Sequence, residues 1–337
     1  MSAVASARPW LSVLMPVFNG RDYLAQALDS VVAQADPGIE CIVVDGGSDD
    51  GTPALAARYA DRLNLRLLDK PESPNWVWST NLALEHASAP FSSILHQDDT
   101  WLPGRAAAMR EMAESDTQAG FCVHAVRFIG ETGRRAGTLT CPWPRYPKRV
   151  DSERAVADLL VQNFLSCPAP VFSTALARQV GGMDETLWYT ADWDFWLKLL
   201  RRTRALYTDH PLAAFRLHAT SQTVQQSRDV RAFREQLDLV LERHGHAVAS
   251  PERRAKVLRA AGFSNTLNAS LAARLHGHPV DWAPVLRQGL ALGPGGMMCF
   301  LRNSRMVSRG LARVRAGLWY RRRRERRTVS QPAGWRE

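Results

Sequence analysis

Cysteine is scarce in this sequence, and no two cysteines lie close together. The 337 residues include five cysteines, an odd number, and no Cys-x-x-Cys motif. This pattern argues against a disulfide framework or a zinc site, and it favours a reduced, intracellular protein. The five are Cys41, Cys122, Cys141, Cys167 and Cys299.

Long apolar runs are missing as well. No run approaches the ~18 residues that a membrane-spanning helix needs. Met1–Pro9 is rich in small residues but lacks the basic region and apolar core of a signal peptide. We therefore expect a cytoplasmic protein without a membrane-spanning segment.

The chain also lacks two common glycine-rich motifs for binding nucleotides. No Gly-x-x-x-x-Gly-Lys-Ser/Thr phosphate loop occurs, and no three-glycine fingerprint follows Val17. Without that fingerprint, a nicotinamide-dependent oxidoreductase is disfavoured.

Excess charge is absent from the first 300 residues. The chain has 43 lysines and arginines against 33 acidic residues, a net charge of +10. Residues 301–337 contain twelve arginines and two glutamates, so they carry the whole excess. This distribution argues against nucleic acid as the partner and indicates one local anionic contact. We expect an anionic membrane surface, which would place the protein peripherally at the cytoplasmic face of the inner membrane.

What the sequence does contain is an alternation of apolar strands and amphipathic helices. Leu11–Val17 and Ile39–Val44 are near-continuous apolar runs, typical of strands buried on both faces of a parallel sheet. Shorter strands are predicted at Leu65–Leu68 and Phe91–Leu95, with helices between successive strands. This order predicts an α/β fold with a doubly wound, mostly parallel sheet flanked by helices.

The pattern is less regular further along the chain. Residues 130–150 are rich in Gly, Pro and Arg, which predicts an irregular excursion over the surface. Two short strands are predicted at Ala205–Thr208 and Leu212–Leu217. Helical periodicity then follows at residues 229–244, 251–275 and 283–292.

The C-terminal region combines an apolar stripe with many arginines. Met297–Tyr320 shows both at helical spacing, and Arg321–Arg327 holds six arginines in seven residues. The pattern suits a helix that lies among lipid headgroups, or a helix docked on the protein with a solvated basic face. We expect three parts: an α/β domain at 1–222, a helical region at 223–320 and a basic tail at 321–337.

Two adjacent carboxylates follow the fourth predicted strand. Asp98 and Asp99 come just past its end, where open α/β sheets bind their ligands. Paired carboxylates suit Mg²⁺ or Mn²⁺, which takes its remaining ligands from substrate phosphates. A solvated turn is the alternative, because Asp-Asp pairs are common in loops.

Asp45 ends the second predicted strand in the same way. Parallel strands would bring it to the same edge of the sheet as Asp98. The following Gly46-Gly47-Ser48 lets backbone approach a ligand closely, and Thr52 opens a helix whose first amides can receive an anion. A glycine-rich turn with a helix cap would account for the glycines and Ser48, but not for Asp45.

Two carboxylates lie in the first turn of a predicted helix that begins after Thr190. Asp192 shares a stripe with Phe195 and Trp196 and is predicted to face the protein body, whereas Asp194 is predicted to lie on the outer side. An inward carboxylate without a basic neighbour is a candidate for function, although helix capping would also favour it.

Arg216 and His218 end the last predicted strand. They are two residues apart and so project from the same face of an extended segment. They would offer a cation and an imidazole to a ligand at the sheet edge. An ordinary hydrogen-bonded loop histidine is the alternative for His218.

Five motifs occur in an order and spacing that resembles glycosyltransferase family 2. They are Leu11–Gly20, Val44–Thr52, Asp98-Asp99, Gly181-Gly182-Met183-Asp184-Glu185 and Asp192-Trp193-Asp194. The resemblance covers about residues 10–220 and does not reach the C-terminal third. It implies a GT-A fold and inverting transfer of a sugar from a nucleotide-diphosphate donor.

The resemblance also implies a role for particular residues. Asp45 would hold the nucleoside, Asp98 the Mg²⁺ or Mn²⁺ that bridges the diphosphate, and Asp192 would be the catalytic base. His218 would be a second metal ligand, with Arg216 near the pyrophosphate. The donor site would further include Pro16, Gly47, Ser48 and His96.

Three positions depart from the family pattern. His96 replaces the first acid of the usual Asp-x-Asp, Gly46 replaces an acid after Asp45, and Ala191 replaces one before Asp192. The expected function is transfer of a sugar to a hydroxyl of a glycan or lipid-linked acceptor in cell-surface polysaccharide or glycolipid assembly. The departures leave open a catalytically weak or inactive nucleotide-sugar-binding or scaffolding protein of the same fold.

Overall fold

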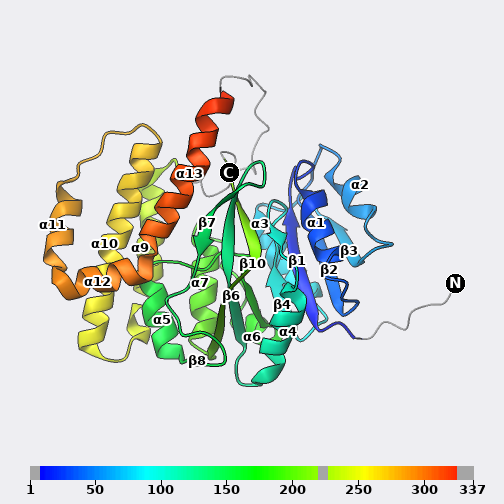
Figure 1. Ribbon diagram of the computed structural model, residues 1–337, viewed down its shortest axis with the longest axis horizontal. Coiled ribbons are helices and arrows are strands. Elements are labelled where there is room, and N and C mark those ends of the chain that lie inside the picture. The colour runs from blue at the N-terminus through cyan, green and yellow to red at the C-terminus, as the bar shows by residue number, and fades with distance from the viewer. Residues whose placement is uncertain (1–7, 219–226, 325–337) are drawn as a thin grey trace.

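One mixed sheet forms the centre of the computed structural model (Figure 1). The structure describes residues 8–218 and 227–324, with side chains as far as residue 317. Within these residues the sheet has ten strands, eight of them in the order β3-β2-β1-β4-β9-β6-β10-β5. The predicted domain boundary at residue 222 and most of the predicted basic tail lie outside the described residues.

The first four strands are parallel, as the sequence predicts. They are β1 (Leu11–Val17), β2 (Ile39–Asp45), β3 (Asn64–Asp69) and β4 (Phe91–Ile94). Helices α1 (Leu24–Val32), α2 (Thr52–Ala57) and α3 (Trp76–His86) connect them. All seven residues of β1 are buried, and the strand contributes Leu14 to one hydrophobic core and Met15 to another. The doubly wound arrangement is therefore confirmed.

The sheet continues through strands of both directions. Strand β9 (Pro170–Ser173) runs antiparallel between β4 and β6 (Phe121–Gly130). Strand β10 (Ala205–Leu217) is parallel to β6, and the two-residue β5 (Thr100–Trp101) pairs antiparallel with it. Because β6 opposes β9, it points the same way as β4. The carboxyl ends of β1, β2, β4, β6 and β10 therefore lie at one edge.

Two sequence predictions about this half are wrong. The segment from Ala205 to Leu217 is one strand, because β10 continues past Pro211 through shifts in register where proline has no N–H to donate. Residues 130–150 are not wholly irregular: β7 (Arg135–Leu139) forms a hairpin with β6, and β8 (Arg149–Val150) pairs with β10.

Helices pack on both faces of the sheet. They include α4 (Arg105–Ser115), α5 (Ser152–Val161), α6 (Thr174–Gln179) and α7 (Ala191–Leu200). Helix α7 is buried on most of its circumference, and its Phe195 and Trp196 pack against Phe172 of β9. The functional sheet edge is thus built on a tightly packed layer.

The C-terminal helices described are α9 (Val230–His244), α10 (Pro251–Leu275), α11 (Ala283–Ala291), α12 (Gly293–Ser304) and α13 (Met306–Arg324), with a 3₁₀ turn at Gly245–Ala247. Helices α9 to α12 lie at one end of the molecule, where α9, α10 and α12 pack on α5 and α9 also contacts α7 (Figure 1). Their inner side chains belong to the same hydrophobic core as the sheet. None of the helices in residues 8–218 and 227–324 combines the length and apolar character that a membrane crossing needs.

The long helix predicted at Met297–Tyr320 is two helices. The backbone breaks at Arg305, where φ is +52°. Helix α13 then packs along β7, and Ala312 and Ala316 share a small core with Phe128. One face of α13 is therefore docked on the sheet.

Asp194 corrects a fourth prediction, because it does not lie on an outer face. Its side chain is 0% exposed, since α9 covers that side of α7. Lys198 lies 2.8 Å from one carboxylate oxygen and the His244 ring nitrogen 2.9 Å from the other. Arg243 approaches the same carboxylate at 3.5 Å. A buried ion cluster thus joins the α/β layer to the C-terminal helices.

This cluster predicts a loss of stability on Asp194→Asn. Burial alone would raise the pKa of Asp194, but hydrogen bonds from His244 and Lys198 outweigh it and lower the pKa to about 2. Removing the charge of the fully buried carboxylate leaves the partly buried Lys198 and Arg243 without their partner, so we expect the free energy of unfolding at pH 7 to fall by roughly 3 kcal/mol. Urea unfolding followed by circular dichroism measures it.

The pH dependence gives a further check on this pair. A lowered folded-state pKa stabilises the protein above the unfolded value of about 4, and this contribution is lost as the pH falls toward 2. The gap between wild type and variant should therefore narrow below about pH 4. Glu114→Gln removes an exposed ion pair with Arg110 and should cost under about 1 kcal/mol. An equal loss in both variants would contradict the proposed importance of burial.

Candidate active site

Asp45 closes β2 at the carboxyl edge of the sheet and is fully buried. Its two oxygens accept hydrogen bonds from the amides of Gly47 (3.0 Å) and Ser48 (2.8 Å) and from the Ser48 hydroxyl (2.6 Å). The Ser48 hydroxyl in turn accepts from the amide of Asn19. Asp45 therefore fixes the loop that follows it.

Two predicted donor-site residues support this loop in different ways. Gly47 has φ +85°, and a Cβ there would lie 3.0 Å from the backbone of Pro71, so glycine suits the position. Pro16 lies inside β1, beside Val44 of β2. It is part of the strand that precedes the loop, rather than of the loop itself.

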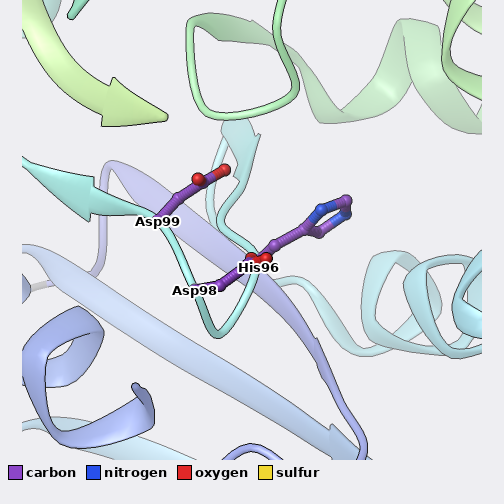
Figure 2. A group of neighbouring side chains, drawn as sticks. All are labelled: His96, Asp98 and Asp99. Carbon is purple, nitrogen blue, oxygen red and sulfur yellow. The ribbon is translucent and has the colours of Figure 1, made fainter. Parts of the chain in front are cut away.

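The turn after β4 carries His96, Asp98 and Asp99 (Figure 2). One potential ligand atom from each lies within 4.8 Å of the others. The His96 Nε2 and Asp99 Oδ2 atoms are buried and have no hydrogen-bond partner among the described residues. Such atoms are costly to bury unless a ligand satisfies them. The turn thus offers an imidazole and two carboxylates to a common ligand.

The end of β10 holds this turn from the other side. His218 Nε2 lies 2.7 Å from Asp98 Oδ2. The amide of Arg216 donates to Asp99 Oδ1 (2.9 Å), and its Nε donates to the backbone oxygen of Asp98 (2.9 Å). The remaining guanidinium nitrogens donate to Gln26 Oε1 and to the Glu131 backbone. Arg216 therefore braces the turn through its backbone amide and its Nε, while its other two guanidinium nitrogens tie it to neighbouring segments.

The charges in the turn affect one another. Burial would raise the pKa of Asp98, but the hydrogen bond and charge of His218 lower it. Burial, followed by the charge of Asp98, raises the pKa of Asp99 well above its usual range. A bound divalent cation would counter this repulsion, because it favours both carboxylates in their charged form.

Asp192 lies in the first turn of α7 with its carboxylate turned inward. Its Oδ2 accepts from Asn163 Nδ2 (3.0 Å) and contacts the Cys167 thiol (3.7 Å), and its Oδ1 accepts from the amide of Trp193 (2.8 Å). Burial raises the pKa of Asp192 to about 6, against the opposing effect of these hydrogen bonds.

Cys167 contacts Asp192 and lies near the turn after β4. Burial raises the pKa of its thiol well above the usual range, and the charges of Asp192, Asp99 and Asp98 raise it further. One buried thiol therefore lies within electrostatic range of all three carboxylates. The sheet brings these acids together, although 94 residues separate Asp98 from Asp192.

The sequence family follows from comparison with known proteins. The sequence model of glycosyl transferase family 2 matches residues 12–179, a span that contains Asp45 and the Asp98-Asp99 turn. The chain belongs to this family. Asp192, His218 and the C-terminal helices lie beyond the matched span.

Relatives of this family 2 chain occur in several bacteria. An uncharacterized glycosyltransferase of Rickettsia prowazekii is 27% identical over 218 residues, which cover 64% of this chain and 66% of the relative. The putative teichuronic acid biosynthesis glycosyltransferase TuaG of Bacillus subtilis is 34% identical over 97 residues, which cover 28% and 38%. The chain thus spans just under two thirds of the Rickettsia relative.

Solved structures share the fold. TarS residues 1–349 of S. aureus, in complex with UDP-GlcNAc, has a TM-score of 0.63 at 16% identity, covering 96% of this chain and 95% of that one. The mannosyltransferase PcManGT of Pyrobaculum calidifontis, in complex with GDP-Man and Mn²⁺, has a TM-score of 0.57 at 20% identity, covering 93% and 88%. The predicted GT-A fold is confirmed.

The residues of this family 2 chain fit a divalent cation at the turn after β4. Asp98 and Asp99 would supply hard oxygen ligands, and the buried Asp99 Oδ2 has no hydrogen-bond partner among the described residues. His218 already contacts Asp98, so it would either bind the cation or orient the carboxylate that does.

The geometry adds two residues to those predicted from the sequence and strengthens the case for a third. The acidic pair makes Asp99 a candidate for a cation, but the family resemblance gives the metal-binding role to Asp98 and not to Asp99. Asn163 and Cys167 contact Asp192 from the segment after α5. No sequence motif predicts a role for Asn163 or Cys167, because their contacts with Asp192 depend on the packing of α5 against α7.

The cation site predicts the effect of Asp98→Asn. The change removes one charged ligand while keeping the size of the side chain, so we expect affinity for Mn²⁺ to fall at least about tenfold. The measurement is the rise in melting temperature that Mn²⁺ causes in the presence of UDP or GDP. Asp61→Asn, at an exposed position away from the turn, is the control. A full Mn²⁺ response in the Asp98 variant would refute the ligand assignment.

Proposed function

We propose that this family 2 chain is a metal-dependent, inverting glycosyltransferase. It would move a sugar from a nucleoside-diphosphate donor to a hydroxyl of a glycan or lipid-linked acceptor. The observation that carries the proposal is the position of Asp192. Its carboxylate faces inward and is partly exposed, and its charge, like those of Asp98 and Asp99, raises the pKa of the Cys167 thiol. One carboxylate can then serve the acceptor while two serve the donor.

The donor end of the site would form on the loops after β2 and β4. Asp45 and Ser48 hold the first loop, and Arg216 and His218 hold the second. A divalent cation bound by Asp98 and Asp99 would neutralise the departing nucleoside diphosphate. Because hydrogen bonds to partly buried groups brace both loops, the donor would meet a preorganised site.

Asp192 would accept the proton of the acceptor hydroxyl. Its pKa of about 6 leaves it charged at neutral pH but more basic than an ordinary carboxylate, as a general base requires. Asn163 and the Trp193 amide fix the orientation of the two carboxylate oxygens. Attack from the side opposite to the leaving group would invert the anomeric carbon.

The names of similar proteins support the substrate class. TuaG is named for teichuronic acid biosynthesis, and the two solved structures hold UDP-GlcNAc or GDP-Man. We infer a nucleotide-sugar donor and an acceptor in cell-surface polysaccharide or glycolipid assembly.

An anionic membrane surface is the partner we propose for the outer face of α13. Val307, Leu311 and Val314 on that helix are 64%, 51% and 60% exposed, and Arg313 and Arg315 are exposed beside them. The most exposed large hydrophobic side chains of the described residues all lie between Leu271 and Val314. An apolar and arginine-rich surface of this kind suits anionic lipid.

The catalytic assignment predicts a severe defect in Asp192→Asn. Loss of the base should lower turnover by about 10²- to 10⁴-fold while affinity for the donor is preserved. Release of nucleoside diphosphate from UDP- and GDP-sugars with Mn²⁺ measures turnover, and calorimetry measures donor affinity. In the wild type, turnover should decline below about pH 6, because Asp192 becomes protonated.

Asp194→Asn is the matched control, two residues away in the same helical turn. It should reduce stability but leave the turnover of the folded protein unchanged. Donor binding without metal-dependent release in the wild type would instead favour an inactive nucleotide-sugar-binding protein, the alternative that His96, Gly46 and Ala191 raise.

The membrane proposal predicts weaker binding to vesicles after Leu311→Asp with Val314→Asp. Both side chains point away from the docked face, so the fold should survive, while each change removes apolar area and adds repulsion from anionic lipid. We expect at least a tenfold loss of binding in sedimentation with phosphatidylglycerol-containing vesicles.

Leu290→Asp on α11 tests whether this loss is local. Leu290 is 83% exposed but lies on another helix, so binding should change little. Equal losses in both proteins, or no loss in the α13 variant, would count against a specific contact through α13.

A further inference from the structure

Arg309 brings the C-terminal helix α13 to the proposed catalytic base. Its Nη1 donates to the backbone oxygen of Asn163 at 2.9 Å. The side-chain amide of the same Asn163 donates to Asp192 Oδ2 at 3.0 Å. A single residue therefore separates the guanidinium from the carboxylate, although 117 residues separate them in sequence.

The guanidinium of Arg309 has donors to spare. The Asn163 oxygen is its one hydrogen-bond partner in the part of the chain that the structure describes, and no carboxylate there pairs with it. Arg309 is only partly buried, so part of the residue is open to solvent. Burial of the residue, followed by the charge of Arg313, lowers the pKa of Arg309 to about 10, so it stays charged at neutral pH.

Two neighbouring arginines on the same segment have a structural role, because each donates to a backbone oxygen of another segment. Arg305 donates to the Cys141 backbone (2.6 Å), and Arg302 donates to the Pro142 backbone (3.3 Å). Both tie the helices to the loop after β7, away from Asp192. Arg309 makes a similar backbone contact but differs in two ways, because it lies within electrostatic range of Asp192 and Tyr189 and has Arg313 one helical turn further on.

We propose that Arg309, together with Arg313, binds an anionic group of the acceptor beside Asp192. The inference rests on the proposed function, in which Asp192 must contact the acceptor hydroxyl. A charged guanidinium with unused donors next to that hydroxyl can hold a phosphodiester or carboxylate oxygen with two parallel hydrogen bonds. Asp98 and Asp99 would hold a cation that neutralises the donor diphosphate, which leaves this second positive site for the acceptor. Acidic glycan acceptors would then be preferred to neutral ones.

The test compares matched pairs of small acceptor probes that differ in charge. Methyl glucuronide is paired with methyl glucoside, and glycerol 3-phosphate with glycerol. The full chain is first loaded with Mn²⁺ and with UDP or GDP, whichever raises its melting temperature. Probe affinity is then measured by saturation-transfer NMR. The carboxylate pair and the phosphate pair together show which anion the site accepts.

We expect the wild type to bind at least one acidic probe about tenfold more tightly than its neutral partner. Arg309→Met should abolish that preference, and Arg309→Lys should retain part of it, since lysine keeps the charge but not the planar fork. Arg313→Glu should reduce the preference without touching the Asn163 contact. Arg305→Met, which removes a bracing arginine, and Arg315→Ala, at an exposed position on another face of α13, should leave it unchanged.

Equal binding of acidic and neutral probes by the wild type, absence of binding by the acidic probes, or a preference that survives Arg309→Met would each overturn the proposal. Nucleotide binding with Mn²⁺ and release of nucleoside diphosphate are measured on the same proteins. If the wild type lacks both, the proposed function has failed. If both are intact and the charge preference is missing, only the acceptor inference has failed.

Discussion

The clamp between the end of β10 and the turn after β4 is the constraint on which the rest of the site depends. Three contacts make it: the Arg216 amide to Asp99, the Arg216 side chain to the Asp98 backbone, and His218 to the Asp98 carboxylate. The turn is also held in register, because β5, which follows it directly, pairs with β10. Two segments more than a hundred residues apart thus fix the position of one pair of carboxylates.

The clamp holds two adjacent carboxylates close together, and a bound cation would offset the repulsion between their negative charges. Asp99 is buried and the adjacent Asp98 side chain is 24% exposed. The contacts satisfy Asp98 better than Asp99, whose second oxygen has no partner among the described residues. Buried like charges are tolerated when a third charge or a ligand compensates them. His218 lowers the pKa of Asp98, but the Arg216 amide and charge do not offset the effect of burial and of Asp98 on Asp99, whose pKa stays raised. The geometry that holds the turn so firmly is therefore more consistent with a ligand site than with a solvated loop.

Much of the fold could be read from the sequence, because parallel strands covered on both faces must be apolar along their whole length. Continuous apolar runs therefore predict the strands at Leu11–Val17 and Ile39–Val44. The acids that follow such strands lie at one edge of the sheet because the strands are parallel. The insertion of β9 against β4 could not be read, since its four residues carry no signal of direction. The burial of Asp194 also escaped prediction, because α9, which covers it, begins 36 residues later.

The residues of the candidate site also fall into two groups, those that the sequence predicts and those that it does not. Asp98 and Asp192 could be singled out from position and periodicity, whereas Asn163, Cys167 and Arg309 could not, because each reaches Asp192 through packing between distant elements. Helix α13 shows why this matters. Alanines at 312 and 316 let it approach Phe128 closely, which carries Arg309 inward while Val307, Leu311 and Val314 stay exposed.

The same helix therefore faces the proposed base on one side and the proposed membrane on the other. An acceptor anchored in lipid at the outer face of α13 would then find Arg309 and Arg313 on the same helix, beside Asp192. A neutral acceptor would gain no binding energy from these two guanidinium groups. The docking of α13 on β7 would therefore couple two properties that a GT-A fold alone does not determine. These are binding to the membrane surface and the preference for acidic acceptors.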